Sequence, residues 1–303
     1  MMEKLLVVAT IAYDAIETPF DKVPKVLGGA ATYIALAASK FKINCGLVSV
    51  IGYDFEDHHL ELLRNNLINC DGIELIKAGK TFFWSGKYHD NMNIRTTLYT
   101  ELNVVEKFTP KIPKYYLDSK VLMIGNLDPR VQLEALVQVK NNAEFIMLDT
   151  MNFWIKNSRD ILDEVISKVD LICVNDEESR LLTNEVSLIN AGAKIQKMGP
   201  DYVIIKKGEN GSILFGDNKI FVTPAFPVNN VIDPTGAGDS FAGGIAGFLS
   251  NNSINFENIK KSIVYGTVLA SFTVESFGVD SLEKVSNIEL QKRLNKFKDL
   301  TSF

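Results

Sequence analysis

Hydrophobic positions along the chain fall into short runs rich in β-branched residues, and these runs alternate with segments of helical period. Strands are predicted at residues 5–12, 43–51, 120–125, 145–149, 171–174 and 202–206. Helices are predicted between them, at residues 29–41, 54–66, 129–140, 159–168 and 177–182. This alternation predicts an α/β protein with a doubly wound, mostly parallel sheet and helices on both faces.

One segment departs from the alternation. Residues 80–88 and 94–102 are two strand-like runs joined by a short polar turn. A hairpin inserted into an α/β core covers a site or pairs with another chain. We therefore expect a single domain, residues 1–303, with a small β-sheet lid formed by residues 11–23 and 78–106. A plain surface hairpin is the alternative.

Composition narrows the class of partner. The 303 residues carry 32 Lys and Arg against 37 Asp and Glu, a net charge of −5. The basic surface that nucleic acids and anionic membranes require is therefore not expected. Three cysteines without a CxxC pair are typical of thiols in a reducing compartment, and no run reaches the ~18 apolar residues of a membrane span. We expect a cytoplasmic protein that binds neither nucleic acid nor membrane.

The strongest chemical signal is the string Asp-Pro-Thr-Gly-Ala-Gly-Asp-Ser at residues 233–240, which leads into a helix-like segment rich in Gly and Ala. Gly236 and Gly238 allow the backbone to turn sharply. The amides and dipole at the start of the helix then form an anion site. Asp239 would stay ionised there, as a base beside a pocket for negative charge, which suits phosphoryl transfer to a hydroxyl. An N-capping Asp at a Gly-rich helix start is the alternative.

Other candidates follow predicted strands, where the ligands of parallel sheets bind. Asp149 and Asn152 follow one strand and Asn126 follows another, so they are candidates to contact an acceptor or phosphate-bound water. Turn-forming residues are the alternative for all three. Arg95, on the predicted hairpin, is a candidate to contact the acceptor or the phosphates, and a solvated arginine is its alternative.

The string at 233–240 resembles DTxGAGD, the second signature of the ribokinase-like (pfkB-type) carbohydrate kinase family. Gly28-Gly29 and the small-residue helix after them resemble its first signature. Asn175 and Glu178 resemble its NxxE motif, and residues 206–211 resemble its nucleotide-binding strand and turn. The resemblance covers essentially the whole chain in the right order, and it implies an ATP-dependent kinase with Mg²⁺ and a homodimer formed through the lid.

The resemblance also implies roles, position by position. Asp239 is implied as the catalytic base, with Gly236, Ala237 and Gly238 as the anion hole. The acceptor is implied to lie against Asp14, Gly28 and Gly29. Contacts to ATP and Mg²⁺, the latter through water, are implied for Asn175, Glu178, Lys206, Gly208, Gly211, Thr235 and Gly238. A monovalent cation such as K⁺ is implied near Asp233, Thr235, Gly278 and Ser281.

One position departs from the family pattern. The family usually has Asn five residues after the first glycine of Gly28-Gly29, where it contacts the sugar, and this chain has Tyr33. The expected activity is transfer of the γ-phosphoryl group of ATP to a hydroxyl of a small sugar or sugar-like acceptor that contacts Tyr33. A nucleoside kinase for an acceptor such as inosine, adenosine or cytidine is the first alternative. A non-catalytic nucleotide-binding sensor is the second.

Overall fold

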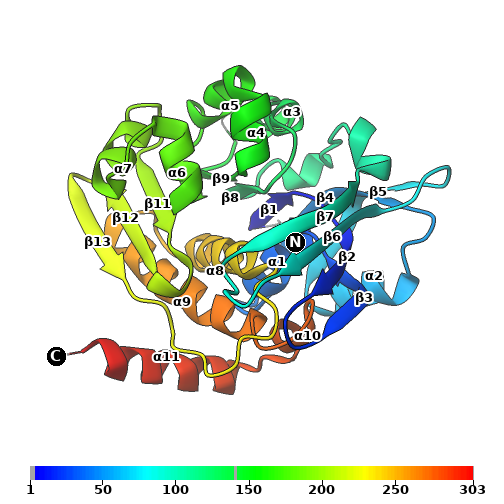
Figure 1. Cartoon of the computed structure of the whole chain (residues 1–303). Helices are drawn as coiled ribbons and strands as arrows, with labels where there is room; N and C mark the ends of the chain where they lie inside the picture. The colour runs from blue at the N-terminus through cyan, green and yellow to red at the C-terminus, as the bar shows by residue number, and fades with distance from the viewer. Residues whose placement is uncertain (1–3, 140–141, 303) are drawn as a thin grey trace.

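The computed structural model describes residues 4–139 and 142–302, and within them the main sheet has nine strands (Figure 1). In spatial order they are β13 (Lys219–Thr223), β12 (Ser212–Gly216), β11 (Tyr202–Lys206), β10 (Leu171–Asn175), β9 (Phe145–Asp149), β8 (Val121–Ile124), β1 (Leu5–Val8), β4 (Cys45–Gly52) and β5 (Ile68–Ile76). The strands from β11 to β5 pair in parallel, whereas β12 and β13 form an antiparallel edge. The predicted fold class is confirmed.

Both faces of the sheet are buried. Successive residues of a strand point to opposite faces, and in β1 both sets of residues belong to a hydrophobic core. Leu5 and Val7 of β1 join one hydrophobic core, and Leu6 and Val8 join the other. The first core is covered by α1 (Ala30–Ser39), α2 (Asp57–Asn65), α8 (Ala237–Asn251), α9 (Phe256–Thr273), α10 (Asp280–Lys284) and α11 (Asn287–Thr301). The second is covered by α3 (Pro129–Val139), α4 (Asn152–Asn157), α5 (Arg159–Ile166), α6 (Asp176–Thr183) and α7 (Leu188–Gln196).

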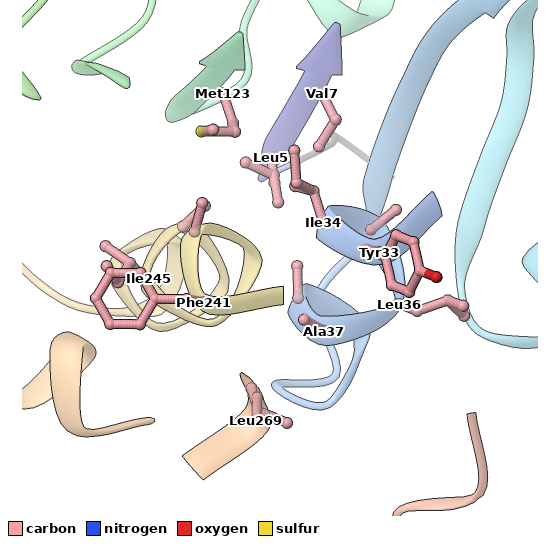
Figure 2. Packing of buried hydrophobic residues seen from close by; sticks show 14 of the residues in the cluster. Leu5, Val7, Tyr33, Ile34, Leu36, Ala37, Met123, Phe241, Ile245 and Leu269 are labelled. Carbon is pink, nitrogen blue, oxygen red and sulfur yellow. The ribbon is translucent and has the colours of Figure 1, made fainter. Parts of the chain in front are cut away.

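Helix α8 lies in the middle of the first core, and Figure 2 shows it beside α1 under the strands. Small residues permit this position. A side chain at Gly243 would collide with the backbone of Ile34 in α1, and one at Gly244 would lie 2.7 Å from Gly266 in α9. The Gly-rich sequence after residue 236 therefore packs the helix between two other helices, which places its N-terminus firmly at the carboxyl end of the sheet.

A second sheet has the strand order β3-β2-β6-β7, formed by β3 (Lys22–Gly28), β2 (Ala12–Glu17), β6 (Phe82–Tyr88) and β7 (Arg95–Glu101). The prediction of one strand over residues 5–12 is wrong at its end. The chain leaves the main sheet after Val8, where the carbonyl of Thr10 accepts the Ala31 amide at 2.9 Å, and it enters the second sheet at Ala12. The second sheet also extends to Gly28, beyond the lid boundary expected at residue 23.

Several elements have no counterpart among the predictions: β3, β5, β12, β13, α4, α7, α9, α10 and α11. The predicted helix 129–140 ends at Val139 as far as it is described, because residue 140 lies outside the described residues. No helix in the described part of the chain is both long and apolar enough to cross a membrane.

Candidate functional site

The turn that begins α8 is fixed from three sides. Gly236 has φ +75°, and a side chain there would collide with the ring of Tyr33, so this position requires glycine. One carboxylate oxygen of Asp233 accepts the amide of Thr235 at 2.9 Å, and the other accepts the amide of Gly278 at 3.4 Å. Asp233 is completely buried. The turn is therefore rigid before any ligand binds.

The predicted anion hole consists of the backbone amides of Gly236, Ala237 and Gly238, and one of these amides already donates a hydrogen bond within the turn. Ala237 donates its amide to the carbonyl of Pro234 at 3.2 Å, so that group already has a partner. Gly238 lies against Lys206, since a side chain at Gly238 would lie 3.4 Å from the ammonium nitrogen. A ligand at Gly238 would thus meet a helix N-terminus and a lysine together, which is a favourable place for a phosphate.

Three carboxyl groups lie beside this turn: Asp14 and Asp233 are buried and Asp239 is half-buried. We call these three residues, together with Tyr33, the carboxylate cluster. Burial, and then the charges of Asp233 and Asp239, raise the pKa of Asp14 to about 7, although the Gly29 amide opposes the rise. Burial also raises the pKa of Asp233 to about 6. Burial and then the charge of Asp149 raise the pKa of Asp239. Asp239 is expected to stay ionised, and burial opposes that expectation because it removes water from the carboxylate.

Tyr33 lies at the centre of the carboxylate cluster. Its side chain is 1% exposed, and among the described residues its hydroxyl has no hydrogen-bond partner. Figure 2 shows the ring of Tyr33 projecting from α1. Burial, and then Asp14, raise the pKa of the phenol well above its ordinary value, so the hydroxyl keeps its proton. The cluster therefore contains an unpaired donor beside several acids.

A second group of charges follows β9, β10 and β11, and we call Asp149, Glu178 and Lys206 the lysine cluster. The ammonium of Lys206 lies 3.0 Å from the Asp149 carboxylate. Burial alone would lower the pKa of Lys206, but Asp149 and Glu178 outweigh it and raise the pKa. Burial raises the pKa of Glu178 to about 7, although Lys206 opposes the rise. These acids share one half-buried cation, the ammonium group of Lys206.

The NxxE motif forms a local structure as well as part of this cluster. Asn175 caps α6: its side-chain oxygen accepts the Glu178 amide at 2.8 Å, and the Glu178 carboxylate accepts the Asn175 amide at 2.7 Å. This capping box holds Glu178 at the carboxyl end of the sheet. The capping role and the predicted metal role are therefore compatible, because the second carboxylate oxygen is outside the box.

The second sheet forms a roof over both clusters. Tyr88, which is 4% exposed, shares a hydrogen bond of 3.0 Å with the hydroxyl of Thr235. Arg95 opposes the burial-induced rise in pKa at Asp14, Glu178 and Asp239, so its positive charge acts on both clusters. Sequence reasoning singled out Arg95 but did not find the contact between Tyr88 and Thr235, since an aromatic residue in a hairpin gives no signal of a distant partner.

The remaining predicted residues divide into two groups. Gly28 and Gly29 lie against Asp14: a side chain at Gly28 would collide with its carboxylate, which accepts the Gly29 amide. The amide group of Asn126 holds the following loop, because its oxygen accepts the Trp154 indole at 2.9 Å and its nitrogen contacts Met151. The other predicted residues lie in loops or at helix starts, away from these contacts. They are Asn152 in α4, Gly208 and Gly211 between β11 and β12, and Ser281 in α10. The backbone amide of Ser281 donates to the hydroxyl of Ser276.

A separate cavity of about 410 Å³ lies on the other side of β3, between α2 and α10. Glu56, His58 and His59 line it, with potential ligand atoms within 4.8 Å of one another. Lys25 already pairs with Glu56 at 2.7 Å. This cavity borders the carboxylate cluster at Gly278, which lines the cavity and donates its amide to Asp233.

Comparison with known proteins gives a consistent result. Residues 2–285 match the family described as pfkB family carbohydrate kinase. A protein of Thermococcus kodakarensis named cytidine kinase is 30% identical, over 82% of this chain and 89% of that protein. The crystal structure of the Methanocaldococcus jannaschii nucleoside kinase has a TM-score of 0.79 at 22% identity, covering 97% and 99% of the two chains. A putative ribokinase II from E. coli, solved with ATP and Mg²⁺, has a TM-score of 0.80 at 20% identity, covering 97% and 100%.

Proposed function

Because the chain belongs to the pfkB family of carbohydrate kinases, we propose that it transfers the γ-phosphoryl group of ATP to a hydroxyl group of a nucleoside. Membership of this family makes it an ATP-dependent phosphotransferase. The position of Asp239 carries the proposal: it lies in the first turn of α8, within the electrostatic reach of Lys206 and Asp149 on one side and of Asp14 on the other. The names of the relatives favour a nucleoside over a free sugar.

Asp239 is the proposed base. A carboxylate is a weak base for an alcohol in the ground state. In a loose phosphoryl-transfer transition state the hydroxyl proton becomes acidic late, so a positioned carboxylate suffices. The raised pKa of Asp239 brings its basicity closer to neutral pH, which favours general-base catalysis once the proton is lost.

The nucleotide phosphates are proposed to bind where α8 begins. Gly236 and Gly238 present the turn, and Lys206 supplies a fixed positive charge beside Gly238. The helix dipole of α8 adds to this field. Thr235, Gly208 and Gly211 are proposed to contact ATP, as the family resemblance implies. Arg95 is proposed to neutralise phosphoryl charge from the roof.

Magnesium fits the donor set of the NxxE motif. Asn175 and Glu178 offer oxygen atoms, which Mg²⁺ prefers, and two of these atoms already accept hydrogen bonds within the protein. The ion would therefore be held largely through water by Glu178 and Asn175. When bound, it neutralises charge on the phosphates. The structure solved with ATP and Mg²⁺ on a similar fold supports this expectation.

The acceptor is proposed to lie under the roof, between Asp14 and Tyr88. Asp14 and the Gly28-Gly29 backbone would bind hydroxyl groups, and Tyr33 forms the floor. Asn126, Asp149 and Asn152 are proposed to border this space. Closure of the second sheet over it excludes water and limits wasteful ATP hydrolysis.

An assay of phosphorylated products tests the proposal. ATP and Mg²⁺ are supplied with cytidine, inosine, adenosine, ribose or fructose, and products are measured by mass spectrometry. We expect a nucleoside to exceed either free sugar by about tenfold or more in kcat/KM. A preference for ribose or fructose would show that the acceptor is a free sugar and not a nucleoside. ATP binding without transfer to any compound would contradict the kinase proposal and favour a nucleotide sensor.

A monovalent cation is proposed beside the same turn. Asp233, Thr235 and Gly278 are brought together there by two hydrogen bonds, whereas Ser281 makes its backbone contact with Ser276. Replacing K⁺ by Na⁺ in the assay is expected to lower kcat. Equal activity in both salts would remove the cation from the proposal.

We also propose a homodimer in the cytoplasm, formed through the second sheet. All seven residues of the edge strand β7 are exposed, and Leu98 and Tyr99 are 51% and 50% exposed. Such an edge readily pairs with another strand. Sedimentation is expected to give a dimer for the wild type and a monomer for Leu98→Asp. A wild-type monomer at high concentration would contradict this part.

A further inference from the structure

The turn of the β6–β7 hairpin reaches the loop between β11 and β12. Figure 1 shows this turn extending from the second sheet across α8 toward β11. The side-chain amide of Asn93 donates to the Glu209 carboxylate at 3.2 Å, across 116 residues of sequence. A Cβ atom built at Gly208 would lie 2.8 Å from the side-chain oxygen of Asn93. Asn93 therefore rests directly on the loop.

Each partner of this contact is ordered by its own hydrogen bonds. In the hairpin, the amides of Ile94 and Asn93 donate to the backbone and side chain of Asn91, at 2.8 and 3.1 Å. In the loop, Lys207 donates to the Gly211 carbonyl at 2.7 Å. The contact thus joins two preformed turns, so its formation orders little additional chain.

The two joined segments carry different parts of the site. The hairpin contains Tyr88 and Arg95, which form the roof of the carboxylate cluster. The loop follows Lys206 and contains Gly208 and Gly211, which are proposed to contact ATP. No other role is needed for Asn93 or Glu209 in the proposed chemistry, and Glu209 lies within residues 206–211, the stretch that resembles the family's nucleotide-binding strand and turn.

We propose that Asn93 and Glu209 form a latch that couples nucleotide binding to closure of the acceptor roof. This inference rests on the proposed function of the loop. A nucleotide that orders residues 207–211 also stabilises the hairpin turn, and a closed hairpin stabilises the loop in return, because coupling between two sites is reciprocal. Asn93 and Glu209 are positioning residues, since neither contacts the reacting atoms.

Amide hydrogen exchange on the ligand-free protein gives the first test. We expect Glu209→Ala to raise exchange at residues 89–94, and Asn93→Ala to raise exchange at residues 207–211, by about two- to fivefold for one exposed hydrogen bond. Glu209→Gln retains an acceptor oxygen and is expected to behave like the wild type. Asp90→Ala, an exposed change in the same turn, is the matched control and is expected to leave residues 207–211 unchanged.

The second test adds the non-hydrolysable ATP analogue AMP-PNP with Mg²⁺. Wild-type protein is expected to show slower exchange at residues 89–94 on binding, and this effect is expected to be lost in Asn93→Ala and Glu209→Ala. The double variant should bind AMP-PNP no more weakly than the weaker single variant, because both changes break one interaction.

The outcomes separate the latch from the proposed function. Reciprocal exchange effects without any binding of AMP-PNP would support the contact but contradict the nucleotide role of the loop. Tight AMP-PNP binding with no protection at residues 89–94 would overturn the latch and leave the kinase proposal intact. Unchanged exchange in both single variants of the ligand-free protein would also overturn it.

Discussion

The carboxylate cluster and the lysine cluster lie at the same edge of one sheet, yet they compensate buried negative charge differently. The lysine cluster has Lys206, 3.0 Å from Asp149. The carboxylate cluster has Arg95 acting from an exposed position, and its members have a pKa of about 7 at Asp14 and about 6 at Asp233. The lysine cluster therefore holds its charge with an ion pair. Among the described residues no ion pair reaches Asp14, Asp233 or Asp239, and the raised pKa values of Asp14 and Asp233 mean that these groups keep their protons to a higher pH than ordinary carboxyl groups do.

Asp239 lies between the two regimes. Burial and Asp149 raise its pKa, whereas Lys206 and Arg95 oppose the rise. A base that exchanges a proton with the acceptor benefits from such a balance, because its ideal pKa lies near the working pH. In the proposed function, the lysine cluster would hold the charges in place and the carboxylate cluster would take part in proton transfer.

The largest expected effect comes from removing the proton acceptor. Asp239→Asn is expected to lower kcat by about 10²–10⁴-fold, the usual range for general-base assistance, with AMP-PNP affinity retained. Steady-state kinetics and calorimetric binding measure the two quantities. Asp201→Asn, an exposed matched substitution, should leave both unchanged. Near-normal turnover in Asp239→Asn would contradict the proposal that Asp239 accepts the proton of the acceptor hydroxyl.

The next effect tests the ion pair. Lys206→Met leaves Asp149 and Glu178 buried without their cation, and it is expected to lower the free energy of unfolding by about 3 kcal/mol at pH 8. We expect a loss at the low end of the range usual for a broken buried ion pair, because the Lys206 side chain is 18% exposed. Denaturant unfolding measures the change.

Two comparisons keep this result interpretable. The loss should be smaller at pH 5, where Glu178, with a pKa of about 7, is protonated in the folded state. Adding Asp149→Asn to Lys206→Met should recover part of the loss, since it removes the unpaired charge. A loss that is independent of pH and unaffected by Asp149→Asn would indicate a packing effect.

A smaller effect concerns pH and the carboxylate cluster. Burial raises the pKa of Asp14 from 3.8 to about 7, so the folded state binds the proton more tightly than the unfolded state does. The contribution of this proton to the free energy of unfolding is fully present below about pH 4 and is lost as the pH rises to about 7. Asp14→Asn removes the dependence, so its stability relative to the wild type should rise between pH 5 and pH 8. Denaturant midpoints at both pH values measure this, and a constant difference would contradict the assigned burial.

The sequence allowed different parts of the molecule to be predicted for different reasons. The parallel sheet followed from local patterns, as in β9 and β11, where the predicted and observed bounds agree. The turn at Gly236 was found because Gly and Asp in a short string have a physical meaning together. The pairing of Lys206 with Asp149, and of Tyr88 with Thr235, joins residues distant in sequence, and no local pattern encodes such contacts.

Charge states were harder to predict than positions. The ionised state expected for Asp239 followed from the helix dipole alone, whereas its pKa depends first on burial and on Asp149, which only the folded chain brings near. Similarly, the amide of Ala237 was expected to bind an anion, and the fold gives it to Pro234. Local rules identify which groups are present at a helix start, but the tertiary surroundings decide which remain available.

The smallest expected effect tests whether the carboxylate cluster truly leaves Tyr33 unpaired. Tyr33→Phe keeps the ring under Gly236 and removes a buried hydroxyl that has no partner among the described residues, so the free energy of unfolding should stay unchanged or rise by up to about 1 kcal/mol. Tyr116→Phe is the matched control, because the Tyr116 hydroxyl donates to the Asn69 carbonyl at 3.0 Å, and its loss should cost about 1 kcal/mol. Denaturant unfolding of both variants at one pH compares them directly. If Tyr33→Phe costs as much as Tyr116→Phe, the phenol has a partner in the ligand-free cluster, and the cluster then contains a hydrogen-bond donor as well as protons to stabilise its acids.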